Sequence, residues 1–364
     1  MQMVLYLWKM NQTSGKYERT YAIDSASSVI WVQRYNDAGD FEIYIRASEN
    51  LWNQFYSYKY ETFITRAGSD AVMVVEKIVT QTDAENGDFI TISGRSAESL
   101  LGRRIIRYQT NFTGTAENCI RQLITENVIS PSDAARKMDI IRLGAAQGYT
   151  DEISVQFTGD NLLDAVSGIC KRFRYGFKLT WDGEYFTFSL YQGTNRTAAQ
   201  TETDPVVFSA ERENLLSSEH TFDKTGFITS VYTAGEGEGS ARIIGNVSYD
   251  GYPMDGGLWR REMWNDQRGL SRTTDDGQMP LDEYYKALAA KSREELAEHL
   301  FILRFEGNVL PNYGYTFGVN YFLGDKVTAR NAYGVSASST ISEVTEVEDE
   351  TGYRIIPTFS DWSV

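Results

Sequence analysis

The chain has 364 residues, 41% of them hydrophobic and 13% aromatic, which is enough to build the cores of about two to four domains. Its 50 acidic and 35 basic residues give a formal net charge of -15. This charge argues against a surface that grips nucleic acid, because phosphate binding needs Lys and Arg concentrated on one face. No apolar run approaches the ~20 residues that span a bilayer, and the N-terminus lacks the features of a signal peptide. We therefore expect a soluble protein made in the cytoplasm.

Residues 1–110 consist almost entirely of predicted short β-strands separated by turn residues. The strands are predicted over 3–8, 17–24, 28–35, 41–46 and 61–65, and a hairpin follows over 75–94. Short strands at regular spacing, with Asn, Asp and Gly between them, are typical of a small barrel or sandwich. A single helical turn that turns Leu100 and Leu101 inward is expected to cover one end of this domain.

The hairpin over 75–94 has a counterpart over 341–360. In each copy an apolar strand leads into an acidic turn that a glycine closes, Gly87 in the first and Gly352 in the second, and an apolar strand then returns. Asn, Asp and Gly supply the positive φ angles that a tight turn needs. We interpret the two hairpins as parts of two related β modules at the two ends of the chain. The alternative is that two amphipathic hairpins resemble each other by chance.

From residue 111 to about 200 the apolar residues recur with a helical period. One helix is predicted over 115–128 with Thr115 as its cap, and a second begins near residue 160 and ends before Gly176. A hairpin follows, in which Asp182-Gly183 is predicted to form a two-residue type I′ turn. These elements indicate a compact α/β domain.

Strands resume after residue 200, and a further helix is predicted over 281–300 from its apolar stripe. The predicted fold class is mainly β with an α/β insert: two related small β-barrel domains separated by an α/β domain and a helical insertion. We place the boundaries at 1–110 for the first barrel, completed by 201–222; 111–200 for the α/β insert; 223–250 and 320–364 for the second barrel; and 251–319 for an inserted loop and helix region.

The sequence predicts no catalytic, cofactor-binding or metal-binding residues. The two histidines, His220 and His299, lie in unrelated elements without a neighbouring His or Cys, so the spacing of a zinc or Cys/His site is absent. Cys119 and Cys170 fall on the apolar stripes of predicted helices, where free thiols behave as small hydrophobic residues.

Three further patterns have both a chemical and a plain structural interpretation. The glycine-rich segment 235–239 resembles a phosphate loop but lacks its Lys, and its two glutamates would repel phosphate, so we interpret it as a mobile surface loop. Asp182 and Glu184 could form a glycosidase pair, or be ordinary turn residues. The acidic hairpin tips could bind Ca²⁺ but lack EF-hand spacing, which favours solvated turns.

A cluster of Trp and Arg gives the one candidate interaction site. Trp259, Arg260, Arg261 and Trp264 lie within six residues of each other, and these residue types are enriched at interface hot spots. We predict a subunit interface here. The alternative is that the tryptophans belong to the core and the arginines extend from it. With 23 Tyr and 7 Trp, an aromatic glycan-binding face is also conceivable, but no spacing locates one.

Several short segments carry a family resemblance through their order along the chain. They are 94–106 (GRSAESLLGRRII), 112–117 (FTGTAE), 161–165 (NLLDA), 207–216 (VFSAERENLL), 235–239 (GEGEG) and 323–327 (LGDKV), with the hairpin 341–360 behind them. In this order they resemble the baseplate hub or tail-associated proteins of long-tailed bacteriophages, specifically the siphovirus Gp-thirty-seven-like family. The resemblance covers nearly the whole chain.

The resemblance implies a homotrimer in which each subunit contributes two tube-like β-barrels, so that three chains form a ring of six. Such a trimer could join a six-fold tail tube to three-fold components at the virion tail tip or baseplate. The implied partners are the distal tail protein ring, the tape measure protein, and a tail fibre, spike or receptor-binding protein. Genomic DNA would pass through the lumen without specific binding. We expect no cofactor and no lipid anchor.

Many members of that family continue into a peptidoglycan-cleaving or fibre domain. Since this sequence stops at Val364, directly after the second hairpin, we expect a hub without an attached enzyme. The alternative function is a stand-alone, β-rich cell-wall glycan binder or glycoside hydrolase.

Overall fold

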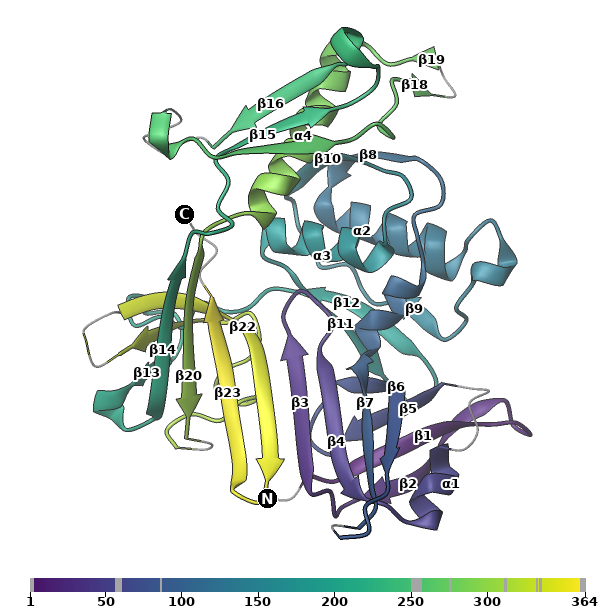
Figure 1. Ribbon diagram of the computed structural model, residues 1–364, viewed down its shortest axis with the longest axis vertical. Coiled ribbons are helices and arrows are strands. Elements are labelled where there is room, and N and C mark those ends of the chain that lie inside the picture. Colours follow the sequence, from purple (N-terminus) through teal and green to yellow (C-terminus); the bar gives the residue numbers. More distant parts are fainter. Residues whose placement is uncertain are drawn as a thin grey trace.

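A β-rich base carries an α/β domain and a smaller α/β unit above it (Figure 1). The computed structural model describes residues 3–55, 61–85, 87–249, 257–274, 277–310, 313–331, 333 and 336–360. The described strands of the base form one sheet of 13 strands, so the predicted mainly β class is confirmed. No helix in these ranges is long and apolar enough to cross a membrane.

The first β module, drawn in purple to blue in Figure 1, contains seven strands and one short helix. Its elements are β1 (Leu5–Asn11), β2 (Lys16–Ile23), β3 (Ser28–Arg34), β4 (Asp40–Arg46), α1 (Glu49–Phe55), β5 (Thr62–Arg66), β6 (Val72–Gln81) and β7 (Phe89–Ser96). The strands pair in the order β3-β4-β7-β6-β5-β1-β2. Alternate apolar residues point inward, as Phe41, Ile43 and Ile45 do in β4. Helix α1 was not predicted; it buries Leu51 and Phe55.

The second β module, drawn mostly in yellow and olive, is assembled from two distant parts of the chain. Its elements are β13 (Val207–Ser209), η4 (Ala210–Arg212), β14 (Leu215–Asp223), β20 (Ile302–Val309), β21 (Lys326–Arg330), β22 (Ser336–Asp349) and β23 (Gly352–Ser360). The strands pair in the order β14-β20-β23-β22-β21-β13. Phe208, Tyr321, Ile341, Val344 and Phe359 form the centre of its core.

The two modules repeat the same strand order. In the first, β3-β4-β7-β6-β5-β1 are neighbours; in the second, β14-β20-β23-β22-β21-β13 are. The matching strands also occur in the same order along the chain, β1, β3, β4, β5, β6 and β7 in the first module and β13, β14, β20, β21, β22 and β23 in the second. The outermost pair differs, since β1 lies antiparallel to β5 whereas β13 lies parallel to β21. The module repeat that the two hairpins predicted is therefore present in the topology.

A β-bulge marks the same place in both hairpins. The register between β6 and β7 shifts between Val75 and Lys77, and the register between β22 and β23 shifts between Ile341 and Glu343. Bulges re-aim side chains and increase local twist, so they are specific features of a strand rather than accidents. The shared bulge supports the alignment of the two hairpins residue by residue.

Strand β22 joins the two modules into one sheet. Its first part pairs with β21, and its later part, Glu343–Glu348, pairs antiparallel with β3 of the first module. Arg66 of β5 reaches Glu346 across this seam with two hydrogen bonds of 2.6 and 2.7 Å, and the two side chains are only 10% and 3% exposed. Tyr353 also donates to Glu346. Burial lowers the pKa of the Arg66 guanidinium, but the hydrogen bonds to Glu346, the charge of Glu346 and the contact with Tyr353 together raise it above its ordinary value.

Three parts of the predicted division into domains are wrong. Strands β13 and β14, predicted within 201–222 to complete the first barrel, pair with β21 and β20 of the second module. The segment 223–250 does not belong to the second module, because its strands form a separate sheet. Within 251–319, predicted as an insertion, β20 pairs with β14 and β23. The inserted part of the chain leaves the sheet at the end of β14 and returns to it at the start of β20. Both of these paired strands therefore belong to the second module.

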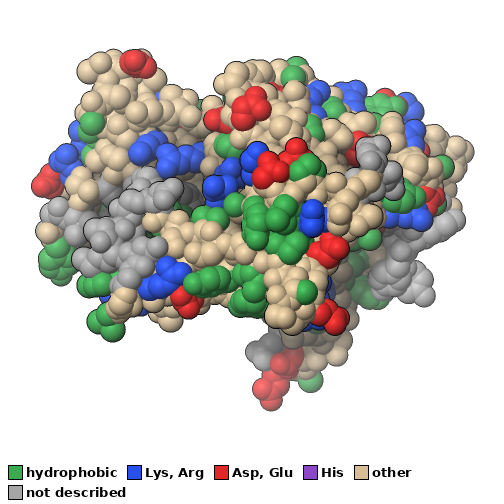
Figure 2. Space-filling model, turned by 90° about the horizontal axis from the view of Figure 1, so that it is seen from above, with side chains coloured by type: hydrophobic (Ala, Val, Ile, Leu, Met, Phe, Trp, Pro, Cys, Tyr) green, Lys and Arg blue, Asp and Glu red, His purple; other side chains and the backbone are tan. Residues whose placement is uncertain are grey.

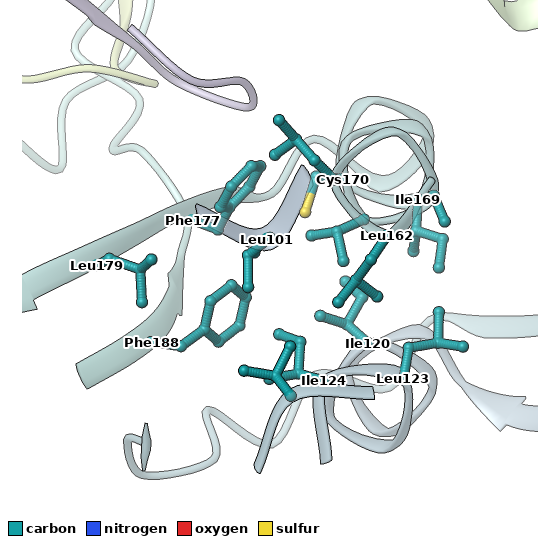
Figure 3. Close-up of a cluster of buried hydrophobic side chains, with 14 of the residues drawn as sticks. Leu101, Ile120, Leu123, Ile124, Leu162, Ile169, Cys170, Phe177, Leu179 and Phe188 are labelled. Carbon is teal, nitrogen blue, oxygen red and sulfur yellow. The ribbon is translucent and has the colours of Figure 1, made fainter. Parts of the chain in front are cut away.

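The α/β domain follows β7 and contains two helices that pack against a small sheet. Its elements are η1 (Ala97–Arg103), β8 (Thr110–Thr115), α2 (Ala116–Ile124), η2 (Thr125–Ile129), η3 (Ala134–Arg136), β9 (Ile141–Leu143), β10 (Glu152–Phe157), α3 (Leu162–Phe173), β11 (Gly176–Trp181) and β12 (Phe186–Tyr191). The helices face β11 and β12 across the buried cluster in Figure 3. Leu101 of η1 is buried, as predicted, but it lies in this cluster and not in the core of the first β module.

Local capping explains where these helices begin and end. Thr115 Oγ1 accepts a hydrogen bond from Asn118 N, which confirms the predicted cap of α2. Helix α3 ends at Arg174, whose φ is 57°, and not at the glycine two residues later.

The hairpin of β11 and β12, which follows α3, also differs from the prediction. Trp181 pairs with Phe186, so four residues rather than two form its turn.

Glu117, in the first turn of α2, fixes a long loop of this domain. Its buried carboxylate accepts hydrogen bonds from the backbone N–H groups of Gln147, Gly148 and Tyr149 at 2.6 to 2.9 Å. A buried carboxylate is tolerable because these donors satisfy its oxygens. No local sequence pattern indicates this role of Glu117.

The upper unit is inserted between β14 and β20 and consists of one helix packed on a three-stranded sheet. Its elements are β15 (Ser230–Ala234), η5 (Gly239–Ala241), β16 (Ile244–Ser248), η6 (Gly257–Trp259), β17 (Glu262–Asp266), β18 (Thr273–Thr274), β19 (Gly277–Gln278) and α4 (Leu281–Glu298). Helix α4 confirms the predicted helix. It buries Tyr284 and Leu288, while Tyr285 is exposed.

The buried pair at the seam makes a stability prediction. Replacing Glu346→Ala leaves the Arg66 guanidinium buried without its partner, which should reduce the free energy of unfolding by about 3–5 kcal/mol. Chemical denaturation followed by tryptophan fluorescence measures this loss. The exposed pair Lys178–Asp70 provides the control, and Lys178→Ala should cost less than about 1 kcal/mol. Equal losses in the two variants would show that the seam does not depend on this pair.

Candidate interaction surface

The histidines and cysteines that the structure describes do not form a metal site. No group of three or more His, Cys, Asp and Glu among the described residues could hold a metal ion. His220 lies in β14, whereas His299 caps the end of α4. Cys119 and Cys170 are buried free thiols, as predicted, and burial raises the pKa of Cys119 to about 12. Neither thiol is set up as a nucleophile, because nucleophilic cysteines have lowered pKa values.

The carboxylates of the 182–185 turn have structural roles. Asp182 accepts hydrogen bonds from the backbone N–H groups of Glu184 and Tyr185 at 2.9 and 2.7 Å and pairs with Arg142 at 2.6 Å. The hydrogen bond from Tyr185, the bond from Glu184 and the Arg142 charge lower the pKa of Asp182. A glycosidase acid needs a raised pKa, so this residue acts as a turn carboxylate.

The glycine-rich segment 235–239 is anchored at its start rather than mobile throughout. A Cβ on Gly235 would lie 2.1 Å from the Tyr284 hydroxyl, so only glycine fits there. That hydroxyl accepts a hydrogen bond from Glu236 N and donates one to Leu270 O. The Glu236 carboxylate accepts from Arg272 N at 2.8 Å. The segment thus ties β15 to α4 and offers no cradle for phosphate.

The Trp and Arg cluster belongs to the sheet of the upper unit. The central strand of this sheet, β15, directs Val231 and Thr233 toward α4, where the Thr233 hydroxyl lies 2.7 Å from the Ser292 hydroxyl. Strand alternation therefore turns the intervening residues to the opposite side. We call that side the outer face; its members are Ser230, Tyr232, Asn246, Ser248, Glu262 and Trp264.

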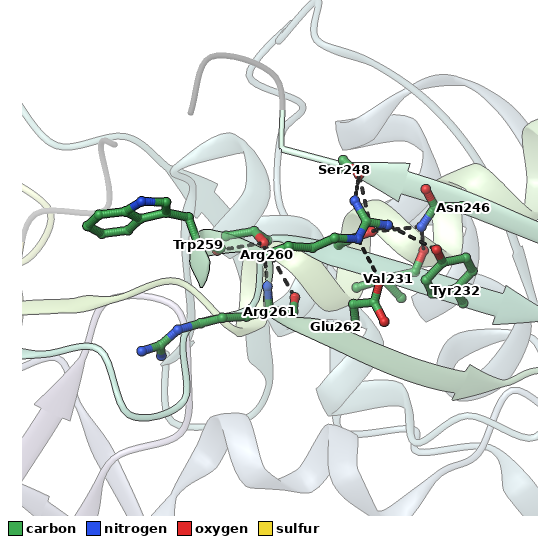
Figure 4. Close-up of polar contacts among 10 residues, drawn as sticks. Val231, Tyr232, Asn246, Ser248, Trp259, Arg260, Arg261 and Glu262 are labelled. Carbon is green, nitrogen blue, oxygen red and sulfur yellow. Dashed lines mark hydrogen bonds and ion pairs between the residues drawn. The ribbon is translucent and has the colours of Figure 1, made fainter. Parts of the chain in front are cut away.

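Arg260 organises the outer face. Its guanidinium donates to the Ser230 and Tyr232 hydroxyls at 2.8 and 3.0 Å and to Ser248 at 3.4 Å (Figure 4). Its Nε donates to the Glu262 carboxylate at 2.5 Å. The guanidinium also lies over the Tyr232 ring, 5.7 Å from its centroid. Because these partners come from all three strands, Arg260 holds the sheet together from its solvent side.

Trp264 lies next to this network and is 54% exposed. It is directly opposite Tyr232 in the parallel ladder between β15 and β17. Arg242 lies over its ring at 5.7 Å and forms an ion pair with Asp266. The Arg242 hydrogen bond lowers the pKa of the Asp266 carboxyl. Aromatic rings combined with fixed guanidinium groups are suited to binding a protein surface and not to proton transfer.

The other two predicted residues point elsewhere. Figure 4 shows Trp259 and the Arg261 side chain directed away from the outer face. Trp259 is 49% exposed, and the backbone of Arg261 is hydrogen-bonded to Thr229. The structure therefore brings together Arg260 and Trp264 and separates them from Trp259 and Arg261. Seen from above, hydrophobic side chains lie beside Lys and Arg side chains on this part of the molecule (Figure 2).

Tyr232, Arg242 and Asn246 of this surface were not predicted. The alternation Ser-Val-Tyr-Thr over 230–233 already indicated a strand with Tyr232 on its polar side. What the sequence could not indicate is that 242–249 and 258–266 lie on either side of that strand. Side-chain proximity across a sheet depends on the pairing of strands, which no local pattern specifies.

The Arg260 network predicts a local effect. Arg260→Met keeps the length of the side chain but loses the hydrogen bonds to three hydroxyl groups. This loss should lower the local stability of the sheet by about 1–2 kcal/mol. Amide hydrogen exchange in β15 and β16 should accelerate roughly tenfold. The control is Arg268→Met, because Arg268 is exposed and makes a single ion pair, with Asp266 at 3.1 Å. Unchanged exchange in Arg260→Met would contradict the organising role of this residue.

Solved structures with the same fold include tail proteins. The chain is similar to a tail protein from Neisseria meningitidis MC58, with 12% sequence identity, a TM-score of 0.56, and coverage of 99% of this chain and 97% of that one. It is also similar to the 43 kDa tail protein of prophage MuSo2 from Shewanella oneidensis, with 13% identity, a TM-score of 0.55, and coverage of 99% and 98%.

A chain of the lidless PdpA–VgrG complex also matches, with 8% identity, a TM-score of 0.50, and coverage of 99% of this chain and 65% of that one. No curated protein matches the sequence. The family model for the siphovirus ReqiPepy6 Gp37-like proteins matches residues 4–360. The chain therefore belongs to the family of siphovirus ReqiPepy6 Gp37-like proteins.

Proposed function

We propose that this protein is a structural hub at the phage tail tip or baseplate. In this role it closes the tail tube as a homotrimer, and it adapts the six-fold symmetry of the tube to three-fold symmetry. Family membership over residues 4–360 and the fold shared with tail proteins support a place in the tail. The fold shared with a chain of the PdpA–VgrG complex supports a hub-like role.

The observation that carries the proposal is the repeated strand order of the two β modules. Each chain contains two units with matching neighbours, β3-β4-β7-β6-β5-β1 and β14-β20-β23-β22-β21-β13. Three chains would therefore present six similar units, in keeping with a six-fold ring, while the inserted domains repeat only three times. Each module would act as one tube-like barrel domain of that ring.

The described side chains support a structural rather than an enzymatic role. Three of the carboxylates described above, Glu117, Asp182 and Glu346, are each engaged by hydrogen bonds that hold a loop, a turn or a seam. A stand-alone glycan binder or glycoside hydrolase remains the competing function, and the experiment below distinguishes it.

The partners would be the distal tail protein ring, the tape measure protein, and a fibre, spike or receptor-binding component. The net charge of -15 suits a channel through which DNA passes without adhering. The outer face of the upper unit, with Arg260 and Trp264 at its centre, would provide one contact to a partner or a neighbouring subunit.

The oligomeric state tests the proposal. Light scattering coupled to size exclusion, and native mass spectrometry, should give the mass of three chains of 41.2 kDa each. Averaged images of tail particles should show a three-fold ring with two modules per chain. A chain that stays monomeric at the highest attainable concentration and binds cell-wall glycan would refute the hub and favour the competing function.

A further inference from the structure

The seam between the two modules has a defined chemistry within the chain. Residues 29–34 of β3 pair antiparallel with residues 343–348 of β22. Arg34 Nε donates to the Glu343 carboxylate at 2.7 Å, and these two residues are directly opposite in the ladder. Gln33 is opposite Val344. Because the modules repeat one strand order, each half of this seam has an equivalent elsewhere in the chain.

The equivalent of β22 is β6. Both strands carry the bulge described above, and Val75 and Ile341 are the last residues before it. Lys77 and Glu343 are the first residues after it, so Lys77 takes the place of Glu343. Ile78 then takes the place of Val344.

The equivalent of β3 is β14. In the first module, residue 41 pairs with Gly94 and with Trp31. In the second, residue 305 pairs with Phe359 and with His220. Since Gly94 and Phe359 are opposite the last residue before each bulge, Trp31 corresponds to His220. Asp223 then takes the place of Arg34, and Phe222 the place of Gln33.

The chemistry of the seam reappears between these equivalents with the charges exchanged. Where Arg34 pairs with Glu343, the equivalent positions hold Asp223 and Lys77. Where Gln33 lies opposite Val344, the equivalents are Phe222 and Ile78, and Phe222 is 58% exposed. Oppositely charged and apolar cross-strand pairs both stabilise a sheet. Like charges at either position would have disfavoured the contact.

The buried ion pair of the seam is also replaced consistently. Val72 and Ser338 are equivalent, because each lies three residues before the last residue ahead of the bulge. Their partners are Thr65 and Thr328, so the next residues along those strands, Arg66 and Ala329, are also equivalent. Thr80 takes the place of Glu346. Both charges disappear together, so no unpaired charge would be buried at the equivalent contact.

The backbone edges that such a contact needs are available. Strand β14 is the last strand of the sheet path, and on its outer edge no described strand pairs with it. Strand β5 pairs with β6 only as far as Val74, so the outer edge of Lys77–Gln81 has no partner among the described strands. Open strand edges are templates for pairing with another chain.

We propose that β14 of one chain pairs antiparallel with β6 of the next, so that Asp223 meets Lys77 and Phe222 meets Ile78. This contact deepens the proposed function and rests on the trimer stated there. Each chain then supplies the eight strands β14-β20-β23-β22-β3-β4-β7-β6 to a continuous sheet, and the contact between chains repeats the seam within each chain. A head-to-tail contact of this kind closes a ring when its rotation matches the number of chains.

Cysteine cross-linking tests the contact in the full-length chain. A Lys77→Cys chain mixed with an Asp223→Cys chain should form a disulfide-linked dimer on mild oxidation. Six strands separate β6 from β14 within one sheet, roughly 30 Å, so the bond cannot form within a chain. A chain that carries both substitutions should give covalent products that stop at the trimer. Cys119 and Cys170 are buried and do not compete.

Charge reversal provides a second readout. Lys77→Asp and Asp223→Lys should each raise the dissociation constant of the trimer about tenfold or more, and the two together should restore it. The matched control is the exposed pair Lys286–Asp282 on α4, where Lys286→Asp and Asp282→Lys should leave assembly unchanged. For cross-linking, Lys137→Cys replaces Lys77→Cys as the exposed control and should give no dimer with Asp223→Cys.

The outcomes separate this contact from the hub proposal. A trimer that neither cross-links through these positions nor responds to charge reversal overturns the β14/β6 contact and leaves the hub intact. Covalent products that continue beyond the trimer support the contact and overturn closure by three chains. A chain that remains monomeric and gives no cross-link overturns both.

Discussion

The antiparallel pairing of β22 with β3 is the contact on which the rest of the structure depends. It joins strands more than 300 residues apart in the chain and turns two β modules into one sheet. The Arg66–Glu346 pair closes this seam, with Tyr353 bound to the same carboxylate and the Trp31 ring under the guanidinium at 5.6 Å. Since a hydrogen-bonded ladder and a buried ion pair connect the modules, their relative orientation is set by specific contacts and not by a linker.

With the sheet fixed, the remaining domains are insertions at its rim. The α/β domain is inserted between β7 and β13, and the upper unit leaves and returns at the β14/β20 hairpin. The two insertions also touch, because Lys291 of α4 lies over the Phe157 ring at 4.9 Å. This support places the outer face of the upper unit at one end of the molecule, far from the modules that would build a tube (Figure 1).

Acidic residues perform two separate tasks in this strongly acidic chain. Buried ones are engaged by several donors each: Glu117 holds three backbone N–H groups, and Glu346 holds Arg66 and Tyr353. Asp349, at a hairpin tip, is a turn residue whose pKa is lowered by hydrogen bonds from Thr351. In both arrangements hydrogen-bond donors satisfy the carboxylate oxygens, which is the condition for a structural role.

The sequence by itself determined the local elements and the repeat of the hairpins. Helical periods identified α2, α3 and α4, and glycine-closed acidic turns identified both hairpins, because these signals depend on neighbouring residues. Only the tertiary structure decided which strands pair: it moved β13, β14 and β20 into the second module, gave β15 and β16 a sheet of their own, and separated Trp259 from Trp264. Strand partners are chosen by backbone edges and side-chain packing from distant parts of the chain, and no local pattern encodes that choice.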